Sequence, residues 1–249
     1  MLTVLTYLWS DDNQHWLCRY SPDDVRRLRS AVRDNLTVPH EFIVATDQPQ
    51  AFASDNGIRA VLLNKTKHIP GTCFAKLMTF HPAGKVLFGE QVFQIDLDTF
   101  VIGNLDAIVS RSEALVLWRN PTRVPWDNPT RTGRCYYNTS FVLHRCGTLP
   151  KIWNDFNPMM ARYRDDQWWI SDAVGPDAPY WDGSDGIYRL ARADTPGSGV
   201  WGKALPDNAR LVTFPGSEGK PDDGYVRAEN PWIERYQSER FAKASLQPS

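Results

Sequence analysis

Along the first hundred positions, continuous apolar runs alternate with segments whose hydrophobic residues recur at helical spacing. This alternation predicts strands separated by helices. Three continuous apolar runs are typical of buried strands, and they lie at residues 2–8, 40–46 and 58–63. Between the first two runs, Ser21-Pro22 followed by two acids indicates the start of a helix. Its inward face is expected at Val25, Leu28, Val32 and Leu36, which recur at helical spacing. Strands that alternate with helices favour an α/β fold with a mostly parallel central sheet flanked by helices.

The pattern after residue 70 predicts further elements with less regular spacing. We expect a helix at 73–80, strands at 113–118, 136–144 and 209–214, a partly helical segment at 149–163 and a helix that opens at Asp165. Residues 176–207 are rich in Gly, Pro and Asp and are predicted to be irregular. A short helix with a frayed end is predicted from Glu229. The chain therefore divides into one domain at 1–228 and a C-terminal helix and tail at 229–249.

Two acids, Asp96 and Asp98, interrupt the apolar run between Val92 and Ile102. Residues at i and i+2 of a strand point to the same side, so the two carboxylates are expected to lie together at a strand end. Burying unpaired carboxylates is costly, and a divalent cation with hard oxygen ligands is a common way to neutralise them. The motif is short, and its structural alternative is a pair of acids that begins a solvated turn. The apolar residues on both sides favour the metal site.

The composition narrows the possible classes of protein. The 249 residues carry a net charge of −1, so no overall charge draws the chain to nucleic acid or to a membrane. The four cysteines form no Cys-x-x-Cys pair, which argues against a zinc site. No apolar run approaches the roughly 20 residues that span a bilayer, and the first residues indicate a strand rather than a signal peptide. We therefore expect a cytoplasmic protein with reduced thiols and no membrane span.

Several segments together resemble the signature of bacterial GT-A glycosyltransferases, and most closely those related to the retaining family 8, the galactosyltransferase and glycogenin type. The segments are Phe74-Ala75-Lys76-Leu77, Gln94-Ile95-Asp96-Leu97-Asp98, Tyr137-Asn138-Thr139-Ser140, Asp166-Gln167-Trp168-Trp169 and Val212-Thr213-Phe214-Pro215-Gly216 followed by Gly219-Lys220-Pro221. Each segment is weak evidence by itself, but their shared order is specific, and the match covers most of residues 2–222. The resemblance implies a single GT-A domain with a Rossmann-like sheet.

The same resemblance implies an activity and a set of site residues. The protein would move a sugar from a nucleoside-diphosphate sugar to an acceptor, with retention of anomeric configuration. A Mn²⁺ or Mg²⁺ ion on Asp96 and Asp98 would neutralise the diphosphate as a Lewis acid. Asp166 and Gln167 would lie near the anomeric carbon as catalytic residues. The implied donor-binding residues are Thr6, Tyr7, Lys76, Asp96, Asn138 and Lys220.

Several of these residues also have a purely structural interpretation. Asn138 suits a turn or a strand end, and an acid such as Asp166 is favourable in the first turn of any helix. Lys76 and Lys220 suit solvated positions on a helix and a loop. The sequence leaves these alternatives open.

The closing segment departs from the family pattern at one position. Where the family has a His that completes the metal shell, the matching position in this chain is Pro215, whose side chain has no ligand atom. Water, substrate, Asp222 or Asp223 would then complete the shell, or metal binding would be weaker. The alternative function is therefore a catalytically silent nucleotide-sugar-binding protein. A nucleotidyltransferase is disfavoured, because Trp9-Ser10-Asp11-Asp12 stands where a Gly-rich and basic phosphate loop would be needed.

The segment Arg119–Arg134 is expected to be a long irregular loop. It contains Pro121, Pro125, Pro129 and Gly133, together with four arginines and a single acid. A loop of this length in a compact domain often acts as a lid or a binding loop. We favour a lid over the donor, and the alternative is a grip on an anionic acceptor such as nucleic acid or a phosphorylated glycan. The acceptor itself is not identified by the sequence.

Overall fold

A seven-stranded sheet forms the centre of the protein in the computed structural model, which describes residues 1–9, 20–63, 73–120, 135–157, 165–191, 199–202, 204–214 and 220–236. The strand order is β3-β2-β1-β4-β7-β6-β8. The strands are β1 (Leu2–Leu8), β2 (His40–Thr46), β3 (Arg59–Leu62), β4 (Gln91–Ile95), β6 (Leu115–Arg119), β7 (Tyr137–Arg145) and β8 (Tyr180–Trp181). The six strands predicted for this sheet are present at the expected positions, and β8 is added to them.

The sheet is mostly parallel, as the alternation of strands and helices predicted. Strands β3, β2, β1 and β4 pair in parallel, and β6 pairs in parallel with β8. Only β7, among the seven strands, runs against its neighbours β4 and β6. The carboxyl ends of β1, β2 and β4 therefore meet at one edge of the sheet, where ligands of such sheets bind.

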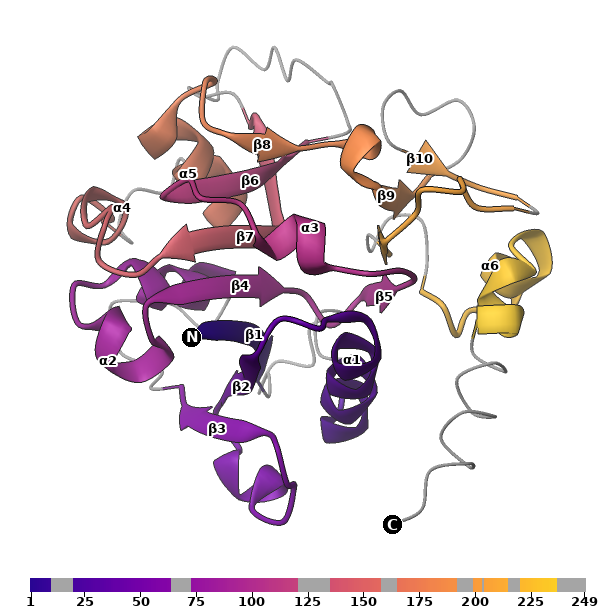
Figure 1. The fold of residues 1–249 in the computed structure, drawn as a ribbon, viewed down its shortest axis with the longest axis horizontal. Helices are drawn as coiled ribbons and strands as arrows, with labels where there is room; N and C mark the ends of the chain where they lie inside the picture. The colour runs from indigo at the N-terminus through magenta and orange to yellow at the C-terminus, as the bar shows by residue number, and fades with distance from the viewer. Residues whose placement is uncertain are drawn as a thin grey trace.

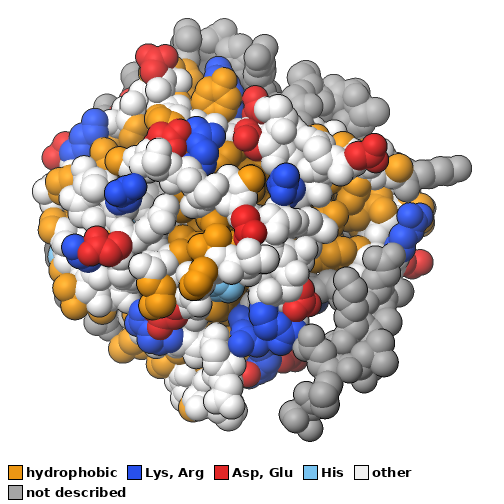
Figure 2. Space-filling model, in the orientation of Figure 1, with side chains coloured by type: hydrophobic (Ala, Val, Ile, Leu, Met, Phe, Trp, Pro, Cys, Tyr) orange, Lys and Arg blue, Asp and Glu red, His pale blue; other side chains and the backbone are white. Residues whose placement is uncertain are grey.

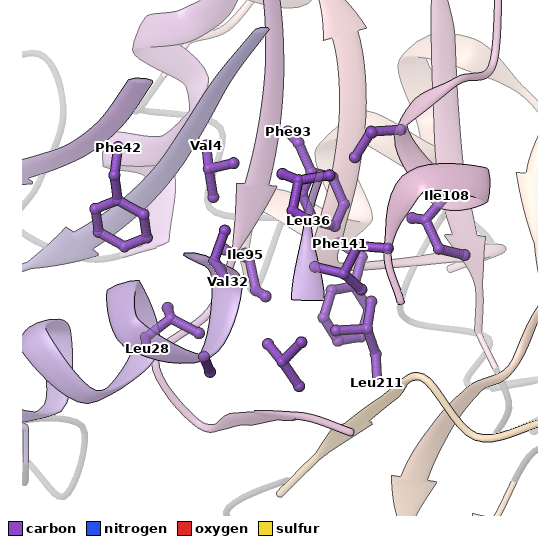
Figure 3. Packing of buried hydrophobic residues seen from close by; sticks show 14 of the residues in the cluster. Val4, Leu28, Val32, Leu36, Phe42, Phe93, Ile95, Ile108, Phe141 and Leu211 are labelled. Atoms are coloured by element: carbon purple, nitrogen blue, oxygen red, sulfur yellow. The ribbon is translucent and has the colours of Figure 1, made fainter. Parts of the chain in front are cut away.

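Helices cover both faces of the central sheet. On one face lie α1 (Pro22–Asn35) and the short α3 (Asp106–Val109), both drawn in front of the strands in Figure 1. The predicted inward residues of α1 are buried and pack against Val4, Phe93 and Phe141 from the strands (Figure 3). The other face is covered by η2 (Cys73–Phe80), α2 (Gly84–Phe88), α4 (Lys151–Asn154) and α5 (Asp166–Val174).

The predicted helix at 73–80 is present, but as the 3₁₀ helix η2 rather than as an α-helix. The Lys76 carbonyl accepts hydrogen bonds from two hydroxyls, that of Thr79 at 3.1 Å and that of Tyr7 at 3.4 Å. The Thr79 bond closes a turn within η2, and the Tyr7 bond connects η2 to the end of β1. The tighter helix thereby fixes the backbone of Lys76 beside the central sheet.

A second, four-stranded sheet was not predicted. Its order is β10-β9-β11-β5, with β5 (Thr99–Val101), β9 (Ile187–Leu190), β10 (Gly199–Val200) and β11 (Leu211–Thr213). Figure 1 shows these strands grouped to one side of the central sheet, near α6 (Gly224–Glu229). The prediction that 176–207 is irregular is therefore wrong, since β8, η3 (Gly183–Asp185), β9 and β10 all lie there. These strands have only two to four residues, too few to show a period, and turn-forming residues surround them.

The small sheet has its own apolar cluster, which includes residues from the predicted tail. Phe100, Val212 and Phe214 from the sheet region pack with Trp232 and Ile233. The Phe100 ring lies 4.8 Å from that of Phe214 and 6.3 Å from that of Trp232, measured between centroids. Residues 232–233 thus contribute to the core beside β5 and β11.

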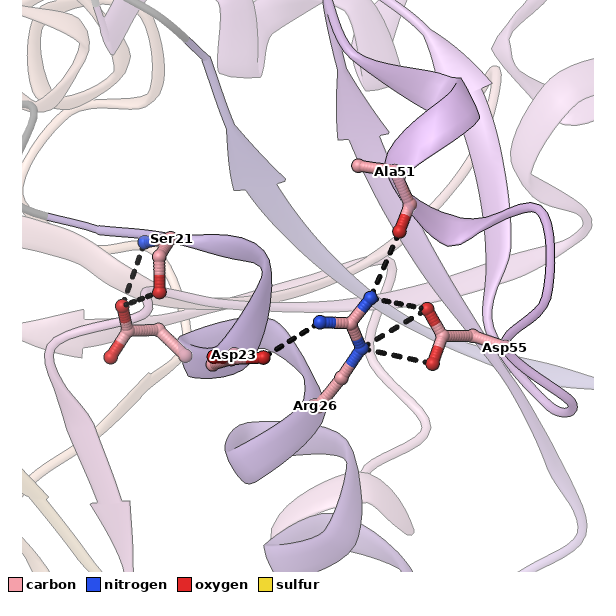
Figure 4. A network of polar contacts seen from close by, with 6 residues as sticks. Ser21, Asp23, Arg26, Ala51 and Asp55 are labelled. Carbon is pink, nitrogen blue, oxygen red and sulfur yellow. Dashed lines mark hydrogen bonds and ion pairs between the residues drawn. The ribbon is translucent and has the colours of Figure 1, made fainter.

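A polar cluster, called here the Arg26 cluster, joins α1 to the segment after β2 (Figure 4). The Arg26 guanidinium donates to Asp55 through Nε at 2.9 Å and Nη2 at 2.9 Å, and to the Ala51 carbonyl at 2.9 Å. It also donates to Asp23 at 2.7 Å. At the start of the helix, the Ser21 amide and hydroxyl both donate to the Asp24 carboxylate, as expected of a helix start.

The surface carries charges of both signs. Figure 2 shows acidic and basic side chains interspersed over one face of the molecule, which agrees with the net charge of −1. Among the helices in the described part of the chain, none is long and apolar enough to cross a membrane.

Candidate functional site

The two predicted acids lie at the junction of the two sheets. Asp96 follows β4 directly, and Asp98 lies between β4 and β5. The Asp96 amide donates to the Ser140 carbonyl of β7 at 3.1 Å, and the Asp98 carbonyl accepts the Phe214 amide at 2.8 Å. Their backbone is therefore fixed by the central sheet on one side and by the end of β11 on the other. The expected placement at a strand end is what the structure shows.

Lys76 of η2 forms an ion pair with the first of these acids. Its Nζ lies 2.5 Å from Oδ1 of Asp96, and the residue is only 8% exposed. Burial acts to lower the pKa of Lys76, but the charges of Asp96 and Asp166 outweigh it and raise the pKa above its ordinary value. Lys76 is thus a permanent buried cation rather than a solvated lysine, which removes its structural alternative of an exposed helix position.

Lys220 pairs in the same way with the second acid. Its Nζ lies 2.9 Å from Oδ2 of Asp98 and donates to the Phe214 carbonyl at 2.7 Å. The ammonium also lies 5.5 Å from the centre of the Tyr20 ring, within the range of a cation–π contact. The other carboxylate oxygen of Asp98 accepts the Thr213 hydroxyl at 3.2 Å. Lys220 therefore belongs to the site and is not a solvated loop residue.

A third acid, Asp166, lies behind this pair in the first turn of α5. The helix begins after Asp165, whose carboxylate caps it by accepting the Trp168 amide at 3.2 Å. Asp166 is 1% exposed, and its Oδ2 has no hydrogen-bond partner among the described residues. Burial raises its pKa from 3.8 to about 6, and the charges of Asp165 and Asp96 act in the same direction, while Lys76 opposes them. An unpaired, buried carboxylate oxygen of this kind is typical of functional sites.

These five residues, called here the acid–lysine site, hold more negative than positive charge. Within the described segments, Asp96, Asp98 and Asp166 face two ammonium groups, those of Lys76 and Lys220. Burial also raises the pKa of Asp98, and the neighbouring Asp96 adds to this, although Lys220 lowers it. The excess of negative charge and the hard oxygens of Asp96 and Asp98 fit a divalent cation. Among the described residues, no group of three or more His, Cys, Asp or Glu forms a larger metal site.

A buried polar network lies beneath the site and includes the predicted residue Tyr7. The Tyr7 hydroxyl shares its one proton between the Lys76 carbonyl and Gln94 Oε1, which lie 3.4 Å and 3.2 Å away, and Gln94 Nε2 donates to the Thr79 hydroxyl at 2.9 Å. Burial raises the pKa of Tyr7 well above its ordinary value, and the charge of Asp166 adds to this effect. Behind Gln94, His144 stacks on Phe80 with centroids 4.3 Å apart, and burial lowers its pKa to about 4. Tyr7 therefore supports Lys76 from below, with its hydroxyl directed inward.

The remaining predicted residues lie around the site with fewer contacts to it. Asn138 accepts the Ser140 amide at 2.7 Å through its side chain, where the register of β7 against β6 shifts. Irregularities of this kind often occur beside active sites. Gln167 follows Asp166 and is half-buried. Thr6 is fully buried in β1, and its hydroxyl has no partner within the described segments. Their roles in donor binding and catalysis stay predictions.

The sequence did not point to several residues that contact the acids. Thr139 hydrogen-bonds Asp166, Thr213 bonds Asp98, and Tyr20 lies against Lys220. Thr213 stood within a quoted motif, but a threonine at the end of a strand carries no signal of its own. Pro215 and nearly all of the Arg119–Arg134 loop lie outside the described residues. In the described part of that loop, the guanidinium of Arg119 lies 4.5 Å from the centre of the Tyr180 ring.

The sheet order and the acids at the end of β4 define the class of fold, which is the GT-A fold expected from the resemblance. Solved structures of the galactosyltransferase LgtC share it. A complex of LgtC with donor and acceptor sugar analogs aligns over 96% of this chain and 94% of its own, with a TM-score of 0.56 and 14% sequence identity. An active-site Gln-to-Glu variant of LgtC aligns over 97% and 96%, with a TM-score of 0.55 and 14% identity. No protein-family model and no curated protein sequence matches the chain.

Proposed function

We propose that the protein is a metal-dependent glycosyltransferase that moves a sugar from a nucleoside-diphosphate sugar to an acceptor, with retention of anomeric configuration. The observation that carries this proposal is the acid–lysine site, in which the buried Asp166 and Lys76 meet the half-buried Asp96, Asp98 and Lys220 at the strand ends of a GT-A fold. Structural ion pairs do not require a third buried acid with an unpaired oxygen. The likeness to LgtC supports the same conclusion, because that enzyme binds donor and acceptor sugar analogs with this fold.

The positions of the charged groups suggest a role for each. Asp96 and Asp98 would hold Mn²⁺ or Mg²⁺, which supplies charge neutralisation to a departing nucleoside diphosphate. Lys220 adds a positive charge that would be shared with the phosphates. Lys76 would orient Asp96 through their 2.5 Å contact. Because each charge is fixed in a buried site, it acts more strongly than it would in water.

Asp166 is the proposed contact with the transferred sugar. Its unpaired oxygen is costly in the ligand-free protein, since buried polar groups are nearly always hydrogen-bonded. A sugar hydroxyl is a neutral donor of the right kind to satisfy it. Gln167, next in the same turn, is assigned to the same task by the resemblance. In this proposal Asp166 and Gln167 lie at the reacting end of the donor, and Lys220 lies at its phosphate end.

The test is a panel of nucleotide sugars with Mn²⁺, scored by release of nucleoside diphosphate and by thermal shift. We expect metal-stimulated transfer or donor hydrolysis with at least one donor. Asp166→Asn should lower turnover far more than donor affinity, because the bond to the sugar matters most in the transition state. The matched control is Asp172→Asn, an exposed acid on the same helix, which should behave as the wild type.

A catalytically silent binder predicts a different result from the same panel. It would bind a nucleotide sugar and show a thermal shift, but no turnover with any acceptor, and Asp166→Asn would change nothing. That outcome would refute the proposal that the protein is an enzyme and would support a catalytically silent nucleotide-sugar-binding protein. Restoring a ligand with Pro215→His should tighten metal binding without changing the donor preference, if Pro215 does replace the family's third ligand.

The acceptor and the location in the cell stay open to experiment. An anionic acceptor held by the Arg119–Arg134 loop remains a prediction, since only Arg119 and Asn120 of that loop are described. Replacing Arg123 and Arg131 should flatten the salt dependence of binding to such an acceptor. An unchanged slope would remove the anionic acceptor from consideration.

A further inference from the structure

Lys220 pairs with the same carboxylate, that of Asp98, that would hold a metal ion in the proposed function. Its ammonium donates to Oδ2 of Asp98 at 2.9 Å and to the carbonyl of Phe214 at 2.7 Å. A divalent ion on the same carboxylate would face this ammonium across a few ångströms, and two like charges so close repel each other strongly in a buried site. Binding of the metal and retention of the Lys220–Asp98 bond therefore compete with each other.

The two lysines of the site differ in what would hold them if a metal ion were bound. Lys76 interacts with Asp166 as well as with Asp96, so one anionic partner remains after the metal takes the other. Among the described residues, Lys220 pairs with one acid, Asp98, and also contacts the Phe214 carbonyl and the face of the Tyr20 ring. Lys220 is accordingly the lysine that a metal ion would displace.

The surroundings of Lys220 would allow its side chain to move without disturbing the site. Its backbone amide is held by the Asp223 carboxylate at 2.7 Å, just before α6. Asp98 keeps its own anchor, because the Thr213 hydroxyl bonds the other carboxylate oxygen at 3.2 Å. The lysine side chain is a flexible four-carbon stem with a compact charge at its end. The ammonium can therefore change partners while the backbones of Lys220 and Asp98 stay in place.

We propose that Lys220 is an exchangeable counter-cation that couples the binding of the metal to that of the donor diphosphate. In the ligand-free protein it neutralises Asp98. When both ligands bind, the metal ion takes Asp98 and the Lys220 ammonium transfers to the phosphates. Either ligand alone leaves one partner unsatisfied, so each promotes the binding of the other. This inference rests on the proposed function, because it assumes a donor that carries a diphosphate and a metal on Asp96 and Asp98.

The coupling has a signature that separates it from a simple phosphate contact. If Lys220 only bound phosphate, its removal would leave the affinity for metal alone unchanged. If it only supported the fold, its removal would weaken metal binding. An exchangeable counter-cation predicts the opposite, since its removal leaves Asp98 without the ammonium that competes with the metal, which then binds more tightly. Because linkage is reciprocal, the gain in metal affinity and the loss of coupling arise from the same competition.

The experiment measures Mn²⁺ binding to the intact protein by calorimetry and by the electron paramagnetic resonance signal of free Mn²⁺. Each titration is made without nucleotide and with UDP, GDP or ADP, and formation of the metal–nucleotide complex in solution is measured in parallel. For Lys220→Met we expect the affinity for Mn²⁺ alone to rise by at least about fivefold, the lower end of typical coupling. The factor by which nucleotide raises Mn²⁺ affinity should fall by a similar amount.

Two controls make the result decisive. Lys220→Gln, a polar replacement, should give the same two changes, and thermal melting checks that each variant folds. Lys85→Met removes a lysine from an exposed ion pair with Glu90 and should leave Mn²⁺ binding unchanged. Equal Mn²⁺ affinity in the wild type and both Lys220 variants would overturn the proposal, as would the absence of Mn²⁺ binding by all of them. Sugar transfer is measured separately, so metal-stimulated transfer with unchanged Mn²⁺ affinity rejects only the role of Lys220.

Discussion

The protein has two clusters of acidic and basic side chains, the Arg26 cluster and the acid–lysine site. The pKa values of their acids are shifted in opposite directions. In the Arg26 cluster, hydrogen bonds from Arg26 lower the pKa of Asp55, and the guanidinium serves two acids near the surface. In the acid–lysine site, burial raises the pKa values of Asp98 and Asp166 despite the nearby lysines. The first cluster stabilises the ionised form of its acid relative to water. The second cluster destabilises the ionised forms of Asp98 and Asp166 relative to water.

The difference shows which cluster is structural and which is suited to a ligand. A cluster that lowers the pKa of its acid contributes to the stability of the folded protein at neutral pH, and it does so without a ligand. A site that raises the pKa of its acids is destabilised by folding, and a ligand that brings positive charge or hydrogen-bond donors relieves this cost. Removal of an acid should therefore have opposite effects on stability in the two clusters, and only in the second should it affect ligand binding.

The largest expected effect is that of Asp98→Ala on metal-dependent activity. Loss of this ligand should remove metal-stimulated binding of the donor, and turnover should fall by about a thousandfold, because the charge stabilisation by a metal ion is worth several kcal/mol. Donor affinity measured by calorimetry with and without EDTA checks this. If EDTA has no effect on donor binding by the wild type, the acid–lysine site does not bind a metal ion, and the two clusters do not differ in ligand binding. Circular dichroism of the variant shows whether the fold is kept.

The next effect is a gain of stability in Asp166→Asn. The folded state raises the pKa of Asp166 from 3.8 to about 6, so between these values the folded form binds more protons than the unfolded form. Stability from this group therefore falls as the pH rises from about 4 to about 6. At pH 7 the variant should be more stable by up to about 3 kcal/mol, and the difference should vanish near pH 4.

Urea unfolding at pH 4 and pH 7 measures this gain. Together with the loss of turnover expected above, it would give the trade-off between stability and activity that is common at functional sites. A loss of stability at pH 7 would mean that the attraction of Lys76 exceeds the cost of burial. Asp166 would then resemble Asp55, and the contrast between the two clusters would not hold.

The central sheet was predictable from the sequence, and the small sheet was not, for a physical reason. The strands at 2–8 and 40–46 are long enough to stand out as continuous apolar runs, and the helix after Ser21 is long enough to show its period. Strands β9 and β10 have four and two residues, and they gain stability from pairing with distant segments. Strands that are stabilised by pairing with distant segments have no recognisable pattern in their own short sequences.

For the candidate site, the sequence predicted the acids and both lysines but not how they pair. The spacing of Asp96 and Asp98 gave their common location, and the order of motifs gave Lys76, Asp166 and Lys220. The contacts of Thr139 and Thr213 with the acids depend on the irregularity in β7 and on the pairing of β11 with β5. Both features arise from residues far apart in the chain, so no single segment encodes them.

A smaller effect is expected for Thr213→Val, which sharpens the comparison by testing how Asp98 is oriented. The change removes the hydroxyl that donates to Asp98 at 3.2 Å and keeps the shape of this buried side chain. Groups that orient metal ligands typically contribute about 10- to 100-fold to metal affinity, and we expect the lower end for a bond of this length. Mn²⁺ titration measures the loss. The control is Thr37→Val, because the Thr37 hydroxyl bonds Asp106, which is not one of the five residues of the acid–lysine site, and its loss should not change Mn²⁺ affinity.

The smallest effect is expected for Asp55→Asn in the Arg26 cluster, and its sign completes the comparison. The folded state lowers the pKa of Asp55, so its contribution is present above the ordinary pKa of 3.8 and is lost as the pH falls through the lower folded value. The variant should therefore melt about 2 °C below the wild type at pH 7, as is typical of partly exposed ion pairs, and the gap should close in acid. Mn²⁺ affinity should stay the same, because the cluster joins α1 to the segment after β2 and contacts none of the five residues of the acid–lysine site. A variant that is more stable than the wild type at pH 7 would show that the Arg26 cluster also carries an unfavourable charge, and the direction of the pKa shift would then no longer separate structural acids from functional ones in this protein.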